Sequence, residues 1–217
     1  AMTSAHVDTF ANDRLPPPEQ QPEYLFDLPE LQFPPQLNCA TELLDRAIDK
    51  GWGERVCIQA PGVRWTYADL LAHANRIANV LVTDMGLVPG NRVLLRAPNN
   101  PMLVASWFAV MKAGGIAVAT MPLLRAKEIR QMVAKGEVTH ALCDMRLADD
   151  LRAAAAEPDC AMLRSIRYFN TAPGGAPEQS LEAAMARQST SFTNVDTAAD
   201  DTCILAFTSG TTGVPKG

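Results

Sequence analysis

The sequence lacks several features that would assign the protein to a class at once. No apolar run reaches the roughly 18 residues that a membrane-spanning helix needs, and the longest, 102–111, is interrupted by Ser106. The amino terminus has no basic patch followed by an apolar core, so we expect no secretory signal. Basic residues are not in excess either, since 19 Lys and Arg face 24 Asp and Glu for a net charge of −5. This balance argues against a protein that coats nucleic acid or an anionic membrane.

Cysteine is present without a framework pattern. None of the five cysteines belongs to a C-x-x-C pair, and their odd number argues against a zinc knuckle or a set of disulfides. Cys57, Cys143 and Cys203 lie in apolar, strand-like runs, where cysteine usually serves as a small core residue. His140 and Cys143 are three positions apart, but one such pair makes no metal site. We therefore predict no metal site and a reducing, cytoplasmic environment.

Proline, by contrast, is concentrated near the amino terminus. Seven prolines between positions 16 and 35 exclude a long helix or a central strand. The sequence predicts an extended arm over residues 1–37. Its apolar side chains, among them Tyr24, Phe26 and Phe33, favour an arm that lies along the surface of the body. A proline-rich ligand for a recognition domain is the alternative.

From residue 38 onward, helix and strand patterns alternate. Helices are expected over 41–50, 67–85, 101–112, 126–135, 147–156 and 178–187. Strands are expected over 56–60, 63–66, 92–97, 116–120, 138–143, 165–169 and 202–207. Thr66 followed by Asp69 predicts a capping box for the second helix. Strand and helix in alternation, with short breaks, indicate parallel pairing. We predict an α/β fold, an open and mostly parallel sheet with helices on both faces, over 38–217.

One segment carries the chemistry. Residues 208–217 hold three glycines, four hydroxyl side chains and Lys216, directly after an apolar strand pattern. Glycines let backbone N–H groups approach an anion, hydroxyls add donors, and a lysine can follow a phosphate. We expect this loop at the carboxyl end of a parallel strand, where open α/β sheets bind ligands.

Three well-known motifs do not fit this loop. A Walker loop needs glycine directly before its lysine and Ser or Thr after it, whereas Gly213 is three positions before Lys216 and Gly217 follows. A Rossmann fingerprint fails because Ser209 occupies its first glycine position. A nucleophile elbow fails because Phe207 and Thr211 occupy its glycine positions around Ser209. The remaining alternative is a flexible polar loop after an edge strand.

The loop resembles the phosphate-binding signature of the adenylate-forming superfamily, which includes acyl- and aryl-CoA ligases, peptide-synthetase adenylation domains and luciferases. Residues 65–70 resemble its first core motif, and residues 112–118 with Pro122 resemble its second. The likeness runs from about Cys39 to the last residue. With the arm segment 26–31 included, the chain most resembles benzoate and 2-aminobenzoate CoA ligases.

The resemblance implies a two-step reaction: a carboxylic acid and ATP give acyl-AMP and pyrophosphate, and CoA as co-substrate then forms a thioester. Lys216 would be catalytic by neutralising the leaving pyrophosphate. The groups holding the ATP phosphates would be Thr208, Ser209, Gly210, Thr211, Thr212, Gly213 and Lys216. Mg²⁺ would accompany ATP, with ligands mostly beyond residue 217.

Because members of this family are much longer, the resemblance implies that residues 38–217 are the amino-terminal subdomain of an AMP-binding domain. We expect such a fragment to be inactive alone, and its truncated sheet edge to support a homodimer or other self-association. Two alternatives remain: a non-catalytic nucleotide- or phosphate-binding module, and an adenylation domain that loads a carrier protein.

Overall fold

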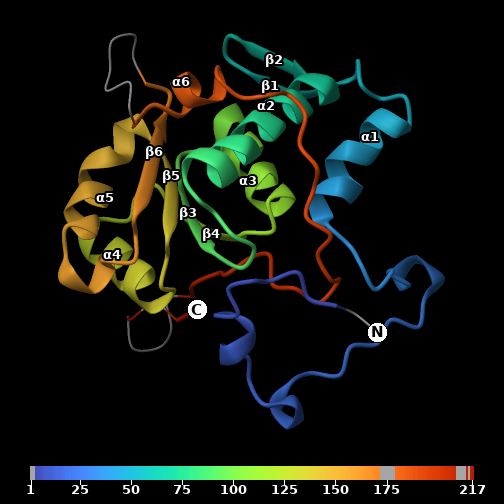
Figure 1. Ribbon diagram of the computed structural model, residues 1–217, viewed down its shortest axis with the longest axis horizontal. Helices are drawn as coiled ribbons and strands as arrows, with labels where there is room; N and C mark the ends of the chain where they lie inside the picture. Colours follow the sequence, from blue (N-terminus) through green and yellow to red (C-terminus); the bar gives the residue numbers. More distant parts are fainter. Residues whose placement is uncertain (1–2, 172–178, 209–213, 215) are drawn as a thin grey trace.

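A computed structural model describes residues 3–171, 179–208, 214 and 216–217. Its centre is a parallel four-stranded sheet in the order β4-β3-β5-β6 (Figure 1). The strands are β3 (Arg92–Arg96), β4 (Ile116–Thr120), β5 (His140–Asp144) and β6 (Ser165–Phe169). Every residue of β3 and β5 is buried, as expected for strands covered on both faces.

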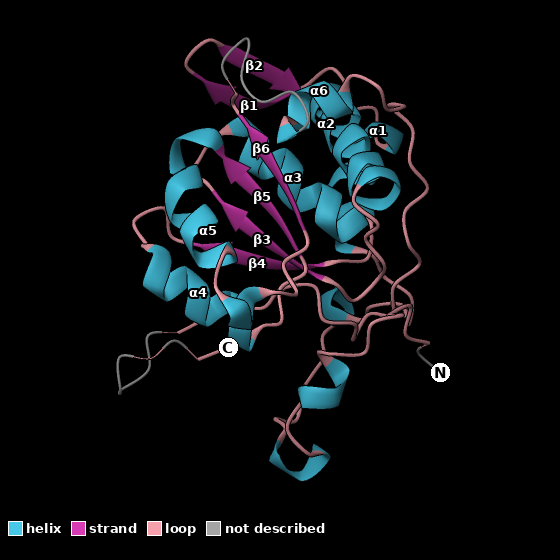
Figure 2. Cartoon of the chain, turned by 60° about the vertical axis from the view of Figure 1, so that its left-hand side comes forward, coloured by secondary structure: helices cyan, strands magenta, loops and turns pink. Residues whose placement is uncertain are grey.

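Helices cover both faces of this sheet (Figure 2). One layer holds α2 (Tyr67–Asn79) and α3 (Pro101–Lys112), and the other holds α4 (Ala126–Lys135) and α5 (Ala148–Ala155). Successive residues of β3 alternate between the layers, since Leu95 packs in the α2–α3 core and Leu94 in the α4–α5 core. The predicted fold class, an α/β sheet between two helical layers, is confirmed.

The two helices of the first layer begin at side-chain caps. The Thr66 hydroxyl accepts from the Asp69 N–H at 3.1 Å, and the Thr66 N–H donates to the Asp69 carboxylate at 2.9 Å. The capping box predicted for α2 is therefore present. Asn100 caps α3 by accepting from the Leu103 N–H at 3.0 Å, with Pro101 as the first helical residue.

Smaller elements surround the sheet. A π-helical turn (Thr41–Asp45) leads into α1 (Arg46–Asp49), and a second one (Val80–Asp84) continues α2. An antiparallel hairpin joins β1 (Val56–Ala60) to β2 (Val63–Thr66). Short 3₁₀ turns occur at Asn12–Arg14, Pro18–Gln20, Pro29–Leu31, Met145–Leu147 and Pro158–Cys160. Within the described residues, none of the helices has the length and apolar character needed to cross a bilayer.

Several predicted elements are shorter in the structure, and two of them differ most. The strand expected over 202–207 is reduced to one bridge between Ala117 and Ile204. It rests on two hydrogen bonds, from the Ala117 N–H to the Cys203 carbonyl at 2.9 Å and from the Leu205 N–H to the Ala117 carbonyl at 3.0 Å. The helix expected over 178–187 is α6 (Leu181–Met185). A segment held by one bridge lacks the consecutive pairs that define a strand.

The amino-terminal arm contacts the body at its two ends. Near its start, the Asp8 carboxylate lies 2.7 Å from an Arg92 guanidinium nitrogen. At its end, the Leu37 N–H donates to the Thr197 carbonyl at 2.8 Å. Between these contacts residues 16–34 turn away from the sheet (Figures 1 and 2). The expectation of an arm lying along the body holds only for its ends, since every residue from 16 to 30 is exposed.

Candidate functional site

The structure brings together the two ends of the glycine- and hydroxyl-rich loop. The Thr208 N–H donates to the Lys216 carbonyl at 2.6 Å, and the Lys216 N–H donates to the Thr208 carbonyl at 2.9 Å. Both residues are exposed. Of the remaining predicted phosphate-binding residues, none lies within the described part of the chain; they are Ser209, Gly210, Thr211, Thr212 and Gly213. The bridge thus places a threonine hydroxyl and a lysine at the two ends of one closed loop.

Apolar packing anchors this bridge to the body. Phe207 and Leu205 are half-buried and pack against the α4–α5 core. Gly217 lies so close to the Phe207 ring that a Cβ atom there would be 3.1 Å from two ring carbons. A Cβ atom on Gly136, just after α4, would be 3.3 Å from a methyl carbon of Leu205. The base of the loop therefore rests beside the carboxyl end of α4.

This position differs from the expected one. Phe207 and Gly217 line a cavity of about 360 Å³ together with Arg92 and Ile116, the first residues of β3 and β4. Residues 209–213 lie outside the described residues, so the position of the phosphate site stays a prediction, but the described base of the loop lies near the amino ends of β3 and β4 and not at the expected carboxyl end. The physical reason is the single bridge to β4: it does not hold the segment alongside the strand, and Leu205 and Phe207 instead bury their side chains beside Gly136.

Positive charge surrounds the same cavity. Its wall includes Arg14 from the arm, Arg92 from β3 and Lys135 from the end of α4. Arg14 pairs with Glu137 at 2.9 Å, and Arg92 pairs with Asp8 at 2.7 Å, whereas Lys135 is exposed. Because carboxylates already neutralise Arg14 and Arg92, the attraction for an anion near the base of the loop comes mainly from Lys135.

A polar network occupies the opposite edge of the sheet. The wholly buried Asp144, at the end of β5, accepts from Arg146 at 2.9 Å, from Asn100 at 3.2 Å and from Asn170 at 2.9 Å. Burial alone would raise the pKa of Asp144, but hydrogen bonds from Arg146 and Asn170 outweigh it and lower the pKa. The network joins the carboxyl ends of β3, β5 and β6. Sequence reasoning missed it because these side chains meet only once the strand order is known.

The described residues do not form a metal centre. No group of three or more His, Cys, Asp or Glu side chains among them is placed to hold a metal ion. His140 and Cys143 belong to opposite faces of β5: His140 bonds the Met85 carbonyl at 2.8 Å, while Cys143 packs in the α4–α5 core. An odd spacing along a strand separates two side chains in this way.

Comparison with known proteins decides the family. The family model described as "AMP-binding enzyme" matches residues 44–217. The chain belongs to this AMP-binding enzyme family. Its sequence is 28% identical to benzoate–CoA ligase of Thauera aromatica, over 87% of this chain and 35% of that protein. The chain thus spans about a third of the length of the curated relatives it matches.

Solved structures agree with the architecture. The anthranilate CoA ligase AuaEII, solved with anthranoyl-AMP, is 24% identical with a TM-score of 0.77, over 85% of this chain and 35% of that one. ATP-bound MatB from Rhodopseudomonas palustris is 31% identical with a TM-score of 0.68, over 83% of this chain and 34% of that one. The parallel sheet and its helical layers are therefore shared with solved chains of which the matched part makes up about a third.

Proposed function

We propose that the polypeptide to which these 217 residues belong activates a carboxylic acid with ATP, giving an acyl-AMP, and then transfers the acyl group to CoA. The acid we propose is benzoate or 2-aminobenzoate. The observation that carries the proposal is the Thr208–Lys216 bridge, which closes the signature loop of an AMP-binding family member with a hydroxyl and a lysine at its two ends. The similarity to a benzoate–CoA ligase supports the aromatic acid.

The loop suits the first chemical step. As the carboxylate attacks the α-phosphate, negative charge grows on the departing pyrophosphate, and donors fixed around it stabilise that charge. Lys216 brings a full positive charge to the loop, and the attacking carboxylate is already ionised, so no general base is required. The groups proposed to hold the β- and γ-phosphates are the side chains of Thr208, Ser209, Thr211, Thr212 and Lys216 and the amides of Gly210 and Gly213.

Magnesium is expected to accompany ATP, but the described residues offer no cluster that fits it. No step proposed here runs through a metal held by these side chains. CoA is the proposed thiol acceptor and the cytoplasm the proposed compartment, which suits five free cysteines. Self-association along the sparsely paired edge of β4 also stays a prediction.

Pyrophosphate release by the whole polypeptide tests the proposal. We expect Lys216→Ala to lower the turnover number about 100-fold, the usual effect of losing a preorganised charge-stabilising donor. Lys127→Ala is the matched control, because Lys127 is an exposed lysine at the start of α4, far along the chain from the loop. Unchanged turnover in Lys216→Ala would contradict the role of the loop.

The acid is tested separately, by comparing benzoate, 2-aminobenzoate, cinnamate and short fatty acids in the same assay. The highest kcat/KM is expected for benzoate or 2-aminobenzoate, and a preference for an aliphatic acid would overturn the proposed substrate while leaving the reaction type intact. The 217-residue chain alone is expected to release no pyrophosphate.

A further inference from the structure

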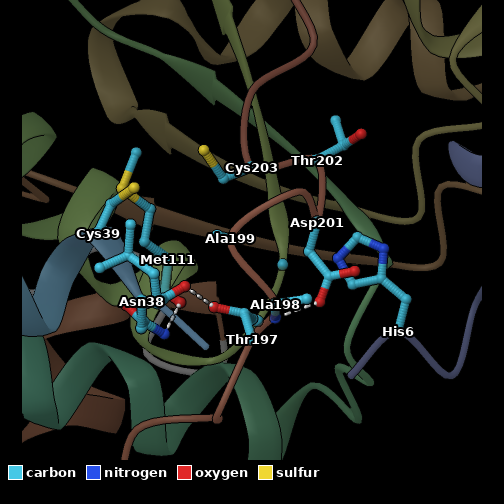
Figure 3. Close-up of a pocket in the computed structure, with 13 residues that line it drawn as sticks. His6, Asn38, Cys39, Met111, Thr197, Ala198, Ala199, Asp201, Thr202 and Cys203 are labelled. Carbon is cyan, nitrogen blue, oxygen red and sulfur yellow. Dashed lines mark hydrogen bonds between the residues drawn. The ribbon is translucent and has the colours of Figure 1, made fainter. Parts of the chain in front are cut away.

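Two cysteines that lie far apart in the sequence meet in a small cavity on the edge of the sheet. Cys39 follows the last residues of the arm, and Cys203 begins the segment that leads to the loop. Both are half-buried and both line a cavity of about 40 Å³ (Figure 3). A cavity of this size has room for about one or two water molecules. The two thiols therefore share one small, partly enclosed space.

The backbone on each side of this pair is held in place. The Asn38 side chain donates to the Met111 carbonyl at 2.8 Å and to the Val195 carbonyl at 3.0 Å, which anchors the residue before Cys39. The Cys203 carbonyl accepts from the Ala117 N–H at 2.9 Å. These contacts fix both cysteines at the wall of the same cavity, although 164 positions separate them in the chain.

Burial, and next the nearby Cys39 thiol, raise the pKa of Cys203 to about 11. Cys203 therefore remains a protonated thiol at neutral pH. The other three cysteines have different surroundings: the Cys57 sulfur lies 3.7 Å from the Trp65 carbonyl, and Cys143 and Cys160 are buried in the α4–α5 core. Of the five cysteines, Cys39 and Cys203 are the two that line this cavity.

We propose that Cys39 and Cys203 are a peroxide-oxidisable pair that closes reversibly to a disulfide. The Cys39 thiolate attacks one oxygen of hydrogen peroxide, and hydroxide leaves as the sulfenic acid forms; the thiol proton of Cys39 converts that hydroxide to water. The sulfur of Cys203 then displaces the sulfenic hydroxyl, which departs as a second water with the proton of Cys203. Two thiols are oxidised and one peroxide is reduced to two waters.

The bond would act on the segment before the loop. Cys203 takes part in the attachment of this segment to β4, because its carbonyl accepts from the Ala117 N–H and the next residue, Ile204, is bridged to Ala117. Linking it to Cys39 ties that segment to the base of the arm. We expect amide exchange of the Leu205 N–H, which donates to Ala117, to slow at least about tenfold on oxidation, because opening of the bridge is restricted.

Thiol counting and peptide mapping test the pair. The protein is treated with hydrogen peroxide, blocked with N-ethylmaleimide, unfolded and digested without reductant. The expected result is a fall from five free thiols to three, one cross-linked peptide pair containing Cys39 and Cys203, and full reversal by dithiothreitol. Cys39→Ser and Cys203→Ser should each abolish the cross-link, whereas Cys57→Ser, the matched half-buried control, should retain it.

The wild-type peptide map shows whether Cys39 and Cys203 form a disulfide, even if a serine variant does not fold. A cross-link between other cysteines, a sulfenic or sulfinic acid on Cys39 without a disulfide, or five remaining thiols would each overturn the proposal. The test is independent of the proposed ligase function, because none of its readouts requires ATP or an acid.

Discussion

His140 makes the stability of this fold depend on pH. Its imidazole is wholly buried in β5, where Nε2 donates to the Met85 carbonyl at 2.8 Å and Nδ1 lies 2.7 Å from the Thr139 hydroxyl. Burial lowers the pKa of His140 from 6.5 to about 4, against the opposing effect of the Met85 carbonyl. The native ring therefore stays neutral at pH values where the histidine of the unfolded chain is already charged.

The direction and the size of this pH dependence of stability follow from proton linkage. Above pH 6.5 the His140 imidazole is neutral in both the folded and the unfolded chain, so its contribution to stability is fully present. As the pH falls from 6.5 towards about 4, only the unfolded chain takes up a proton on this histidine, and the contribution is lost. The complete loss is about 3 kcal/mol, and the part between about pH 7 and about pH 5 is roughly 2 kcal/mol.

Urea unfolding of the wild type and His140→Gln at these two pH values measures the effect. We expect His140→Gln to be less stable than the wild type at neutral pH. Its free energy of unfolding should fall by roughly 2 kcal/mol less than that of the wild type between the two pH values, since glutamine does not titrate. His73→Gln is the control, because His73 is only half-buried on α2 and stacks on Trp65. An equal decline in the wild type and His140→Gln would refute the reasoning.

Three further substitutions test local contacts by urea unfolding. Asp8→Ala should lower the free energy of unfolding by about 2 to 3 kcal/mol, because it leaves Arg92, which is 1% exposed, without its carboxylate partner. A loss near zero would show that the backbone carbonyls alone are enough to stabilise the buried guanidinium. Gly90→Ala should cost more than Gly62→Ala: both glycines have positive φ, but only at Gly90 would the new Cβ meet the Asp8 carbonyl oxygen, at 2.0 Å, and equal losses would contradict that clash. Thr66→Ala should cost about 1 kcal/mol through the lost cap, and no change would argue against the capping box.

Local patterns predicted most elements because the forces that form them are local. α3, α4, β4 and β6 match the expected ranges residue for residue, since Pro101 and Asn100 start α3, and Gly136 follows the end of α4. The π-helical turns next to α1 and α2 were not foreseen, because an extra residue in a helical turn leaves no clear mark on apolar spacing.

Part of the candidate site was likewise predictable from the sequence, and part was not. The loop was recognisable because its chemistry is contiguous in the chain, and Thr208 and Lys216 do meet. The position of the loop's base near the amino ends of β3 and β4 was not recognisable, because it follows from how few bonds the segment makes to β4 and from the apolar contacts of Leu205 and Phe207.

By itself the amino-acid sequence determined the α/β class, the bounds of the best helices and strands, and the loop that assigns the family, since each depends on residues within about ten positions of one another. The tertiary structure alone decided the strand order β4-β3-β5-β6, the burial of Arg92 under Asp8, the network around Asp144 and the meeting of Cys39 with Cys203. Those features join residues that are distant in the chain, and the packing of helical layers on a sheet, which no local pattern encodes, brings them together.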